Sequence, residues 1–149
     1  MSLELNACVY ATHISVAALA VARENARRLG ARVDFLACDL ASAIADHGLD
    51  LLVSNPPYIP AEEEAGLPRE VREHEPRGAL YAGPEGLDAY RSLIADAPRL
   101  PRPGGWLVVE LGYRQVDAVR AMLDARWSEV SVVSDLAGLP RVLAARLPA

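Results

Sequence analysis

The stretch Leu49-Asp50-Leu51-Leu52-Val53-Ser54-Asn55-Pro56-Pro57-Tyr58 decides how the rest of the sequence is interpreted. Its first half is almost entirely apolar, which is typical of a central parallel strand buried on both faces. After Asn55, two successive prolines fix the backbone φ angle and cannot donate hydrogen bonds. Because open α/β sheets bind ligands beyond the carboxyl ends of their strands, residues 55–58 lie where a functional site is expected.

Strand-like and helix-like apolar segments alternate on both sides of this stretch, which favours an α/β fold with a largely parallel sheet. Upstream, a helix that Ser15 caps and Gly30 ends is expected between two short strands. The segments predicted as strands are residues 7–12, 32–37, 49–54, 106–111, 129–134 and 142–146, and those predicted as helices are residues 15–29, 41–47, 87–100 and 116–125. The last two strands should pair antiparallel, because their connection is too short for a crossover. Residues 60–86 predict a long functional loop, with a helical turn around residues 69–73.

Length and composition narrow the classes of protein that the chain can be. Its 149 residues predict a single domain over residues 1–149. The net charge of −5 and the isoelectric point near 5.2 argue against a broad nucleic-acid surface. Neither a secretory signal nor an apolar run long enough for a membrane span is found, so a cytoplasmic location is expected. Cys8 and Cys38 have no metal-site spacing and are interpreted as structural, so no metal is expected.

Residues 55–58 carry groups that suit a planar amide or amine nitrogen. The Asn55 side chain and the Pro56 carbonyl can each accept one N–H bond, and the flat ring of Tyr58 can pack against the plane of the group. If both N–H hydrogens are held, the nitrogen lone pair points toward a methyl sulfonium. The methyl group can then be transferred by in-line displacement, and catalysis comes mainly from positioning. The alternative is that Asn-Pro-Pro-Tyr is only a rigid turn that leaves a strand.

The chain resembles the protein-(glutamine-N5) methyltransferases that modify the Gly-Gly-Gln loop of peptide-chain release factors. The motifs that carry the resemblance are Val9-Tyr10-Ala11-Thr12-x-Ile14-Ser15, Ala22-Arg23-Glu24-Asn25-Ala26, residues 50–60, Glu75-Pro76, Gly86-Leu87, Pro103-Gly104-Gly105, Glu110-x-Gly112-x-x-Gln115 and Asp135-Leu136-Ala137-Gly138-x-x-Arg141-Val142. Asn-Pro-Pro-Tyr alone is shared with DNA adenine and RNA methyltransferases, so the ordered set of later motifs makes the resemblance specific.

The resemblance implies a Rossmann-like class I methyltransferase sheet, mostly parallel, with an antiparallel C-terminal strand pair. It implies S-adenosyl-L-methionine as cofactor and a release factor as protein substrate. Asn55, Pro56 and Tyr58 would be catalytic, and Pro57 would join them in binding the substrate glutamine. The residues implied to contact the cofactor are His13, Asp39, Leu40 and Asn55, with a helix N-cap as the alternative for Asp39. Structural or loop-ordering roles are expected for Glu75, Glu110, Gln115 and Arg141.

The chain departs from the family pattern in two places. The family's first strand and its glycine-rich loop, which wraps the methionine part of the cofactor, have no counterpart in the sequence, whose first glycine is Gly30. His13 stands where the family has an acidic residue that accepts hydrogen bonds from the cofactor ribose. A neutral imidazole has one acceptor at most, so a solvated loop residue is the alternative for His13. We therefore expect weak or absent cofactor binding by this chain.

The missing strand would lie in the middle of the family's usual strand order, 3-2-1-4-5-7-6. Strand edges left without a partner tend to pair, so we expect either a rearranged sheet or a homo-oligomer formed through these edges. Two other functions stay open at this point. One is a nucleic-acid amino methyltransferase, with Tyr58 stacked on an extruded base. The other is a non-catalytic remnant of the fold.

Overall fold

A computed structural model describes residues 7–74 and 76–149 of the chain. The chain divides into two compact units, the first ending at Ile44 and the second spanning Ala45–Ala149. The opening residues 1–6 and the family-motif residue Glu75 lie outside the described residues.

The first unit is a β-α-β unit, in which strand β1 (Val9–His13) leads into helix α2 (Val16–Leu29) and then into strand β2 (Val33–Ala37). The strands pair in parallel from Val9↔Val33 to His13↔Ala37. Helix α2 begins where the Ser15 hydroxyl accepts a hydrogen bond from the Ala18 amide, and it ends at Gly30, whose φ of 67° suits a residue without a Cβ. The predicted helix and both of its caps are confirmed.

The second unit contains a four-stranded mixed sheet with the order β3-β4-β6-β5. Strand β3 (Leu49–Ser54) pairs in parallel with β4 (Pro101–Glu110), while β6 (Pro140–Arg146) is antiparallel both to β4 and to β5 (Ser128–Ser134). The antiparallel C-terminal pair is therefore confirmed. Strand β3 has the bounds that its apolar run predicts. It is, however, an edge strand of this sheet with Leu51 and Val53 exposed, so the expectation of a central strand buried on both faces is wrong for the described residues.

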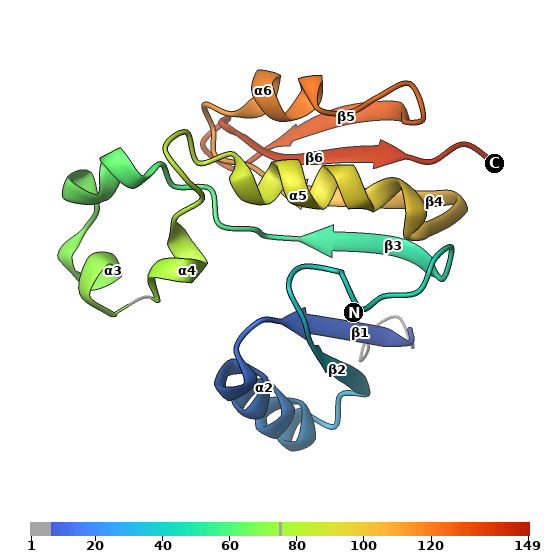
Figure 1. Ribbon diagram of the computed structural model, residues 1–149, viewed down its shortest axis with the longest axis horizontal. Helices are drawn as coiled ribbons and strands as arrows, with labels where there is room; N and C mark the ends of the chain where they lie inside the picture. The colour runs from blue at the N-terminus through green and yellow to red at the C-terminus, as the bar shows by residue number, and fades with distance from the viewer. Residues whose placement is uncertain (1–6, 75) are drawn as a thin grey trace. The chain divides into compact units, whose positions relative to one another are not determined.

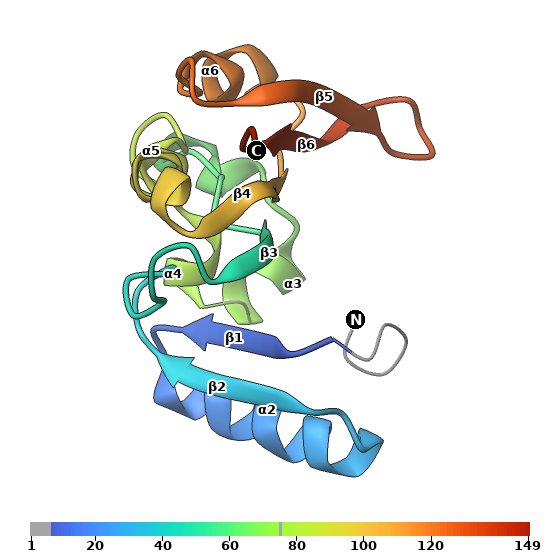
Figure 2. The same ribbon diagram turned by 90° about the vertical axis from the view of Figure 1, so that its right-hand side faces the viewer.

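The core of the second unit lies between this sheet and the helices on one of its faces. Helices α5 (Asp88–Asp96) and α6 (Val116–Ala121) both lie on that face, as Figures 1 and 2 show. Fully buried side chains of the sheet include Leu107, Val109 and Leu143, and those from α5 include Tyr90 and Leu93. Removing a leucine-sized side chain from water contributes about 1.5–3 kcal/mol, so this layer stabilises the edge of the sheet that carries residues 55–58.

Between β3 and α5 the chain forms short helices rather than one structureless loop. These are η1 (Ala61–Gly66), α3 (Arg69–His74) and α4 (Arg77–Leu80), and a further 3-10 turn, η2 (Ala97–Arg99), follows α5. The two ends of the excursion are joined by an isolated parallel bridge between Ile59 and Tyr81, in which the Ile59 amide donates to the Leu80 carbonyl at 2.9 Å. An ion pair between Arg77 and Glu64 links α4 back to η1. The segment of short helices between β3 and α5 therefore begins and ends at the bridge between Ile59 and Tyr81.

The strand order agrees with the family pattern from which the first strand is removed. In family numbering, β2-β1 are strands 3-2 and β3-β4-β6-β5 are strands 4-5-7-6. Within the described residues, β1 and β3 each pair along one edge only, and the order is not rearranged. Of the two outcomes that the sequence suggested, rearrangement is therefore wrong, and pairing between copies stays a prediction.

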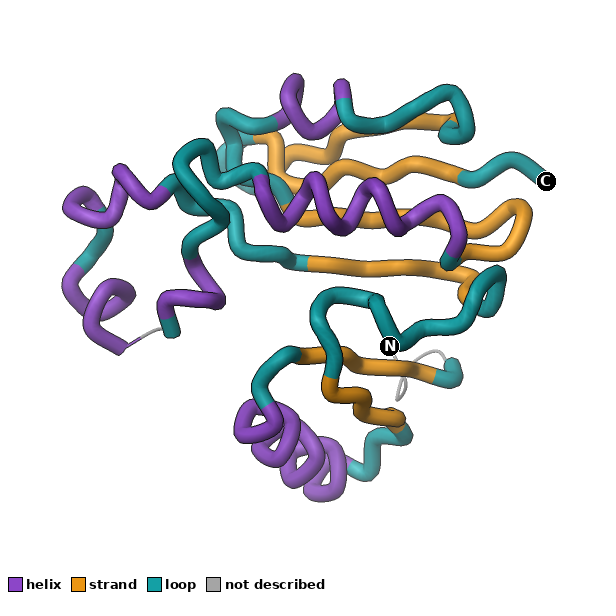
Figure 3. Tube along the Cα trace, viewed as in Figure 1, coloured by secondary structure: helices purple, strands orange, loops and turns teal. Residues whose placement is uncertain are grey.

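Element boundaries differ from the sequence prediction at several places. Residues 41–47 form turns, not a helix (Figure 3), and a left-handed φ bounds the segment at Leu40 (45°) and at His47 (53°). Strand β4 begins at Pro101 because Pro101 pairs with Leu49 before a register shift. Helix α6 ends at Ala121, four residues before the predicted end. No helix in the described part of the chain is long and apolar enough to cross a membrane.

Candidate functional site

Asn55, Pro56, Pro57 and Tyr58 follow directly after β3, at the carboxyl end of the strand. Because Ser54 pairs with Val109 in the parallel neighbour β4, the next residue of β4, Glu110, ends at the same edge of the sheet. The sheet therefore brings Asn55 and Glu110, which are far apart in sequence, to one place. This edge is where open α/β sheets bind their ligands.

The side chain of Tyr58 is held at its hydroxyl end by Glu110. Its hydroxyl donates a hydrogen bond to Glu110 Oε1 at 3.3 Å. Burial and the nearby Glu110 carboxylate raise the pKa of Tyr58, which keeps the hydroxyl protonated and able to donate. The ring also lies close to Gly112, because a Cβ atom added there would be 3.3 Å from Tyr58 Cδ2. Both ring position and ring plane are therefore constrained.

Tyr90, from α5, fixes the turn that follows β4. Its hydroxyl donates to the Glu110 carbonyl at 2.9 Å and accepts from the Gly112 amide at 3.3 Å. The side chain is fully buried, and this burial raises the pKa of Tyr90 to about 12. A neutral hydroxyl can donate and accept at once, so Tyr90 satisfies two main-chain groups on either side of Leu111.

Gln115 connects the loop after β3 to the turn before α5. Its Nε2 atom lies 2.9 Å from the Tyr58 carbonyl oxygen and 3.2 Å from the carbonyl oxygens of both Glu85 and Gly86. Its Oε1 atom is buried and has no hydrogen-bond partner among the described residues. One side-chain amide thus joins segments that are 57 and 30 residues away in sequence.

Arg141 links the hairpin between β5 and β6 to the same edge. Its guanidinium donates to the Leu111 carbonyl and to Asp135 Oδ2, each at 3.3 Å. Asp135 Oδ1 accepts from the amides of Ala137 and Leu139, and these hydrogen bonds, together with Arg141, lower the pKa of Asp135. The hairpin turn is therefore ordered by one carboxylate.

The groups predicted to bind the substrate amide remain available. Asn55 is exposed, and neither its side chain nor the Pro56 carbonyl takes part in a hydrogen bond within the described residues. Pro56 itself is buried and Pro57 is partly buried, so the backbone that carries these acceptors is anchored. The segment thus carries two neutral oxygen acceptors and, two residues after Pro56, an aromatic ring whose hydroxyl is held by Glu110.

The residues predicted to contact the cofactor in the first unit lie at the carboxyl ends of β1 and β2. His13 is exposed, and its Nδ1 atom accepts a hydrogen bond from the Ser15 amide at 2.8 Å. With Nδ1 used in this way, a neutral imidazole at position 13 has an Nε2–H donor left and no free acceptor.

Asp39 is exposed and its carbonyl accepts from the Ser42 amide, in a turn rather than at the start of a helix. The helix N-cap considered for Asp39 is therefore wrong, and its carboxylate is free among the described residues to accept hydrogen bonds. The neighbouring Leu40 has a positive φ, a conformation that costs energy for a leucine and that often accompanies a functional loop. One donor and one acceptor therefore lie at the ends of adjacent strands.

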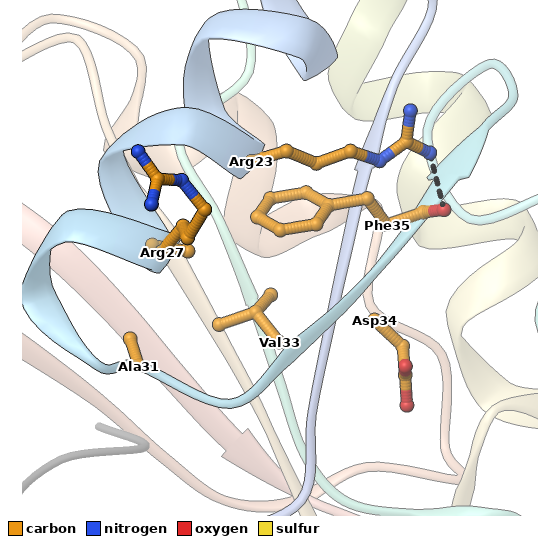
Figure 4. Close-up of a pocket in the computed structure, with 7 residues that line it drawn as sticks. Arg23, Arg27, Ala31, Val33, Asp34 and Phe35 are labelled. Carbon is orange, nitrogen blue, oxygen red and sulfur yellow. Dashed lines mark hydrogen bonds between the residues drawn. The ribbon is translucent and has the colours of Figure 1, made fainter.

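A separate hollow of about 450 Å³ lies between α2 and β2 (Figure 4). The Arg23 guanidinium lies over the Phe35 ring, 5.8 Å from its centroid, and donates to the Phe35 carbonyl at 3.2 Å. The remaining lining comes from Ala26, Arg27, Ala31, Val33 and Asp34. The hollow includes no residue that the sequence predicts for the site.

The sequence identified most of the polar residues at this edge, but not how they contact each other. The sequence places Glu110, Gln115 and Arg141 in family motifs but does not say which residues they contact. In the structure, Glu110 contacts Tyr58, Gln115 contacts Gly86, and Arg141 contacts the β5–β6 hairpin. Tyr90 was missed altogether. The available signal was its place in a helix one turn before the apolar pair Leu93 and Ile94, where a buried tyrosine needs a partner for its hydroxyl.

Residues 3–68 match the family model of the methyltransferase small domain. A release factor glutamine methyltransferase from Cereibacter sphaeroides is 48% identical over 142 residues, which cover 93% of this chain and 51% of that protein. Another, from Moorella thermoacetica, is 50% identical over 137 residues, which cover 89% of this chain and 48% of that protein. The chain thus spans about half the length of the curated relatives that it matches.

Solved structures with a similar fold include methyltransferases at low sequence identity. A methyltransferase from Pyrococcus furiosus superposes with a TM-score of 0.72 at 16% identity, covering 99% of this chain and 66% of that one. An S-adenosylmethionine-dependent O-methyltransferase from Thermotoga maritima superposes with a TM-score of 0.67 at 12% identity, covering 97% of this chain and 51% of that one. At these identities, the likeness establishes the α/β fold with its mixed sheet.

Proposed function

We propose that this chain, a sequence relative of the release factor glutamine methyltransferases over about half of their length, carries the amide-binding side of such an enzyme. In the proposed reaction, the side-chain nitrogen of a glutamine in a release factor forms a bond to the methyl group of S-adenosyl-L-methionine as the sulfur–methyl bond breaks. S-adenosylhomocysteine leaves, and one N–H proton of the amide is released to solvent. The observation that carries the proposal is that Asn55 Oδ1 and the Pro56 carbonyl are free acceptors among the described residues, in the same segment as Tyr58, whose hydroxyl is held by Glu110.

In this proposal, the site residues act by orientation. The two N–H bonds of the glutamine amide would donate to Asn55 and to the Pro56 carbonyl, and the Tyr58 ring would pack against the amide plane. With both hydrogens held in one plane, the nitrogen lone pair points along a single direction. S-adenosylmethionine, when bound, supplies the electrophilic methyl group. Positioning of this kind accounts for large rate accelerations without a strong base.

His13 and Asp39 are the groups that would hold the adenosine part of the cofactor. His13 would donate through Nε2–H, and the Asp39 carboxylate would accept from hydroxyl or amino groups. A glycine-rich loop for the methionine part has no counterpart in the sequence, so we expect weak binding, which calorimetry with S-adenosylmethionine measures directly. Low-micromolar affinity would contradict that expectation.

Incubation with S-adenosylmethionine and a Gly-Gly-Gln-containing release-factor peptide tests the function by mass spectrometry of the peptide. We expect one added methyl group on the glutamine side chain. Asn55→Ala should lower the rate about 100-fold, because it removes an acceptor that positions the reacting nitrogen. Tyr58→Phe keeps the ring and loses only the hydrogen bond to Glu110, so it should lower the rate by only about 2- to 12-fold.

The remaining results separate the alternatives. Methylation of an adenine-containing oligonucleotide in place of the peptide would contradict the glutamine assignment and favour a nucleic-acid substrate. Absence of methyl transfer to either probe would favour a non-catalytic remnant. A cytoplasmic location and a homo-oligomer stay predictions; the assembly is tested below.

A further inference from the structure

The Gln115 side chain occupies a position in which only one orientation of its amide satisfies its surroundings. The carbonyl oxygens of Tyr58, Glu85 and Gly86 lie within 3.2 Å of one side-chain atom of Gln115. Three acceptors around one atom require that this atom be the Nε2 donor and not the Oε1 acceptor. The two hydrogens of Nε2 are therefore shared among three main-chain carbonyls.

Two glycines leave the space that this amide needs. A Cβ atom at Gly86 would lie 2.3 Å from the Tyr58 carbonyl oxygen and 2.7 Å from Gln115 Nε2. A Cβ atom at Gly112 would lie 2.4 Å from Gln115 Oε1. Gly86 also has a positive φ of 69°, whereas Gly112 is not among the positive-φ glycines. Alanine at position 112 is thus excluded mainly by the Gln115 side chain, which makes Gly112 the cleaner probe.

Tyr58 is consequently fixed at both ends. Its carbonyl accepts from Gln115 Nε2 at 2.9 Å, and its hydroxyl donates to Glu110 at 3.3 Å. The proline ring of Pro57 limits the torsions between Tyr58 and the Pro56 carbonyl. A shift of the Tyr58 backbone would therefore move the Pro56 carbonyl, one of the two acceptors proposed for the substrate amide.

We propose that Gln115 is a positioning residue that sets the geometry of the amide-binding segment, residues 55–58, by holding the Tyr58 carbonyl against the turn formed by Glu85 and Gly86. Gly112 is part of the same arrangement, because the absence of a Cβ atom at this position leaves room for Gln115 Oε1. The inference deepens the proposed function and rests on it for the effect on catalysis. The positioning itself is measured independently of turnover.

The structural test measures hydrogen exchange at the Ile59 amide, which donates to the Leu80 carbonyl one residue after Tyr58, and at the Gly86 amide, which donates to the Gly83 carbonyl. Gln115→Ala and Gly112→Ala should each accelerate exchange at both amides by about tenfold, the effect of losing one net hydrogen bond. The double variant should exchange no faster than Gln115→Ala, because the clash at position 112 disappears with the glutamine. Arg120→Ala, an exposed change on the same helix, is the matched control and should leave exchange unaltered.

Gln115→Glu distinguishes positioning by the amide from simple space filling. At neutral pH, its carboxylate would face three carbonyl oxygens without a hydrogen to donate, so exchange should be faster than in Gln115→Ala. Lowering the pH toward 5 protonates part of the carboxyl groups and should restore protection in Gln115→Glu but not in Gln115→Ala. Unchanged exchange in Gln115→Ala, additive effects in the double variant, or no pH rescue would each overturn the proposal.

The kinetic test uses the Gly-Gly-Gln peptide and separates this inference from the proposed function. Gln115→Ala should lower kcat/KM about tenfold or more, and Gly112→Ala/Gln115→Ala should stay within about twofold of that value. A wild-type chain that transfers no methyl group, with the exchange effects present, would overturn the proposed function and leave the positioning intact. A wild-type chain that is active, with kcat/KM unaltered in Gln115→Ala, would overturn the positioning alone.

Discussion

At the scale of single residues, the side chains that hold the candidate site differ from those proposed to act in it. Asn55 and Pro56 offer free acceptors, whereas Glu110, Gln115 and Tyr90 bond to protein groups around them. The supporting residues come from β4, α6 and α5, so each element next to the sheet edge supplies one of them. Changes in the supporting residues should therefore act on stability as well as on any activity.

Tyr90→Phe gives a prediction for the dependence of stability on pH. The folded-state pKa of Tyr90 is about 12, above its ordinary value of 10.0, so the neutral hydroxyl is favoured in the folded state. Its stabilisation is fully present below pH 10 and is lost as the pH rises through about 12.

Urea denaturation of the wild type and of Tyr90→Phe at pH 8 and pH 11 checks this expectation. At pH 8 the variant should be less stable by about 1–3 kcal/mol, because two main-chain groups lose their partner. At pH 11 the difference should shrink, since phenylalanine has no proton to lose. A difference that is the same at both pH values would contradict the argument.

At the scale of elements, the sequence predicts the bounds of β3 and α2 well, because the residues that define these bounds lie within or next to each element. An apolar run defines Leu49–Ser54, and Ser15 and Gly30 mark the two ends of the helix. The turn at residues 41–47 could not be predicted in the same way, since an Ala-rich segment favours a helix while the left-handed φ of Leu40 is set by its surroundings.

The same limit applies to the candidate site. Asn-Pro-Pro-Tyr is recognisable as a motif, but the contact from Tyr58 to Glu110 spans 52 residues and follows only from the pairing of β3 with β4. The three-carbonyl position of Gln115 depends in addition on α6 and on the turn before α5. The motifs identify these residues in the sequence, but the contacts between them follow only from the pairing of the strands.

The β5–β6 hairpin gives a prediction at this scale. Asp135 orders the turn as an ionised carboxylate with a lowered pKa, so its stabilisation is present above its ordinary pKa near 3.8 and is lost as the pH falls through the lower folded-state value. Asp135→Asn keeps an acceptor for the amides of Ala137 and Leu139 and loses the charge that pairs with Arg141. Asp135→Ala loses both contributions.

Hydrogen exchange at the Leu139 amide measures this difference. Exchange should be slowest in the wild type, intermediate in Asp135→Asn and fastest in Asp135→Ala. The gap between the wild type and Asp135→Asn should close in acid, because protonation removes the same charge. Equal exchange in both variants would mean that the turn is ordered by something other than this side chain.

At the scale of the whole molecule, the two sheets leave edges and side chains that can associate. Strands β1 and β3 each have one partner in the described residues, and Leu51 and Val53 of β3 are exposed. Unpaired strand edges next to apolar side chains favour pairing between copies. We expect sedimentation to show a concentration-dependent oligomer, and Val53→Lys to shift it toward the monomer. A monomer at every concentration would contradict this prediction.

The division of the chain at Ile44 has a further consequence for engineering. Every rung of the β1–β2 ladder lies before this point, and every rung of the β3-β4-β6-β5 sheet lies after it. A peptide cut there would sever no strand pairing, so the two halves are natural fragments for a split-protein reporter. Any reassembly signal would then report only on attraction between the halves and not on the repair of a broken sheet.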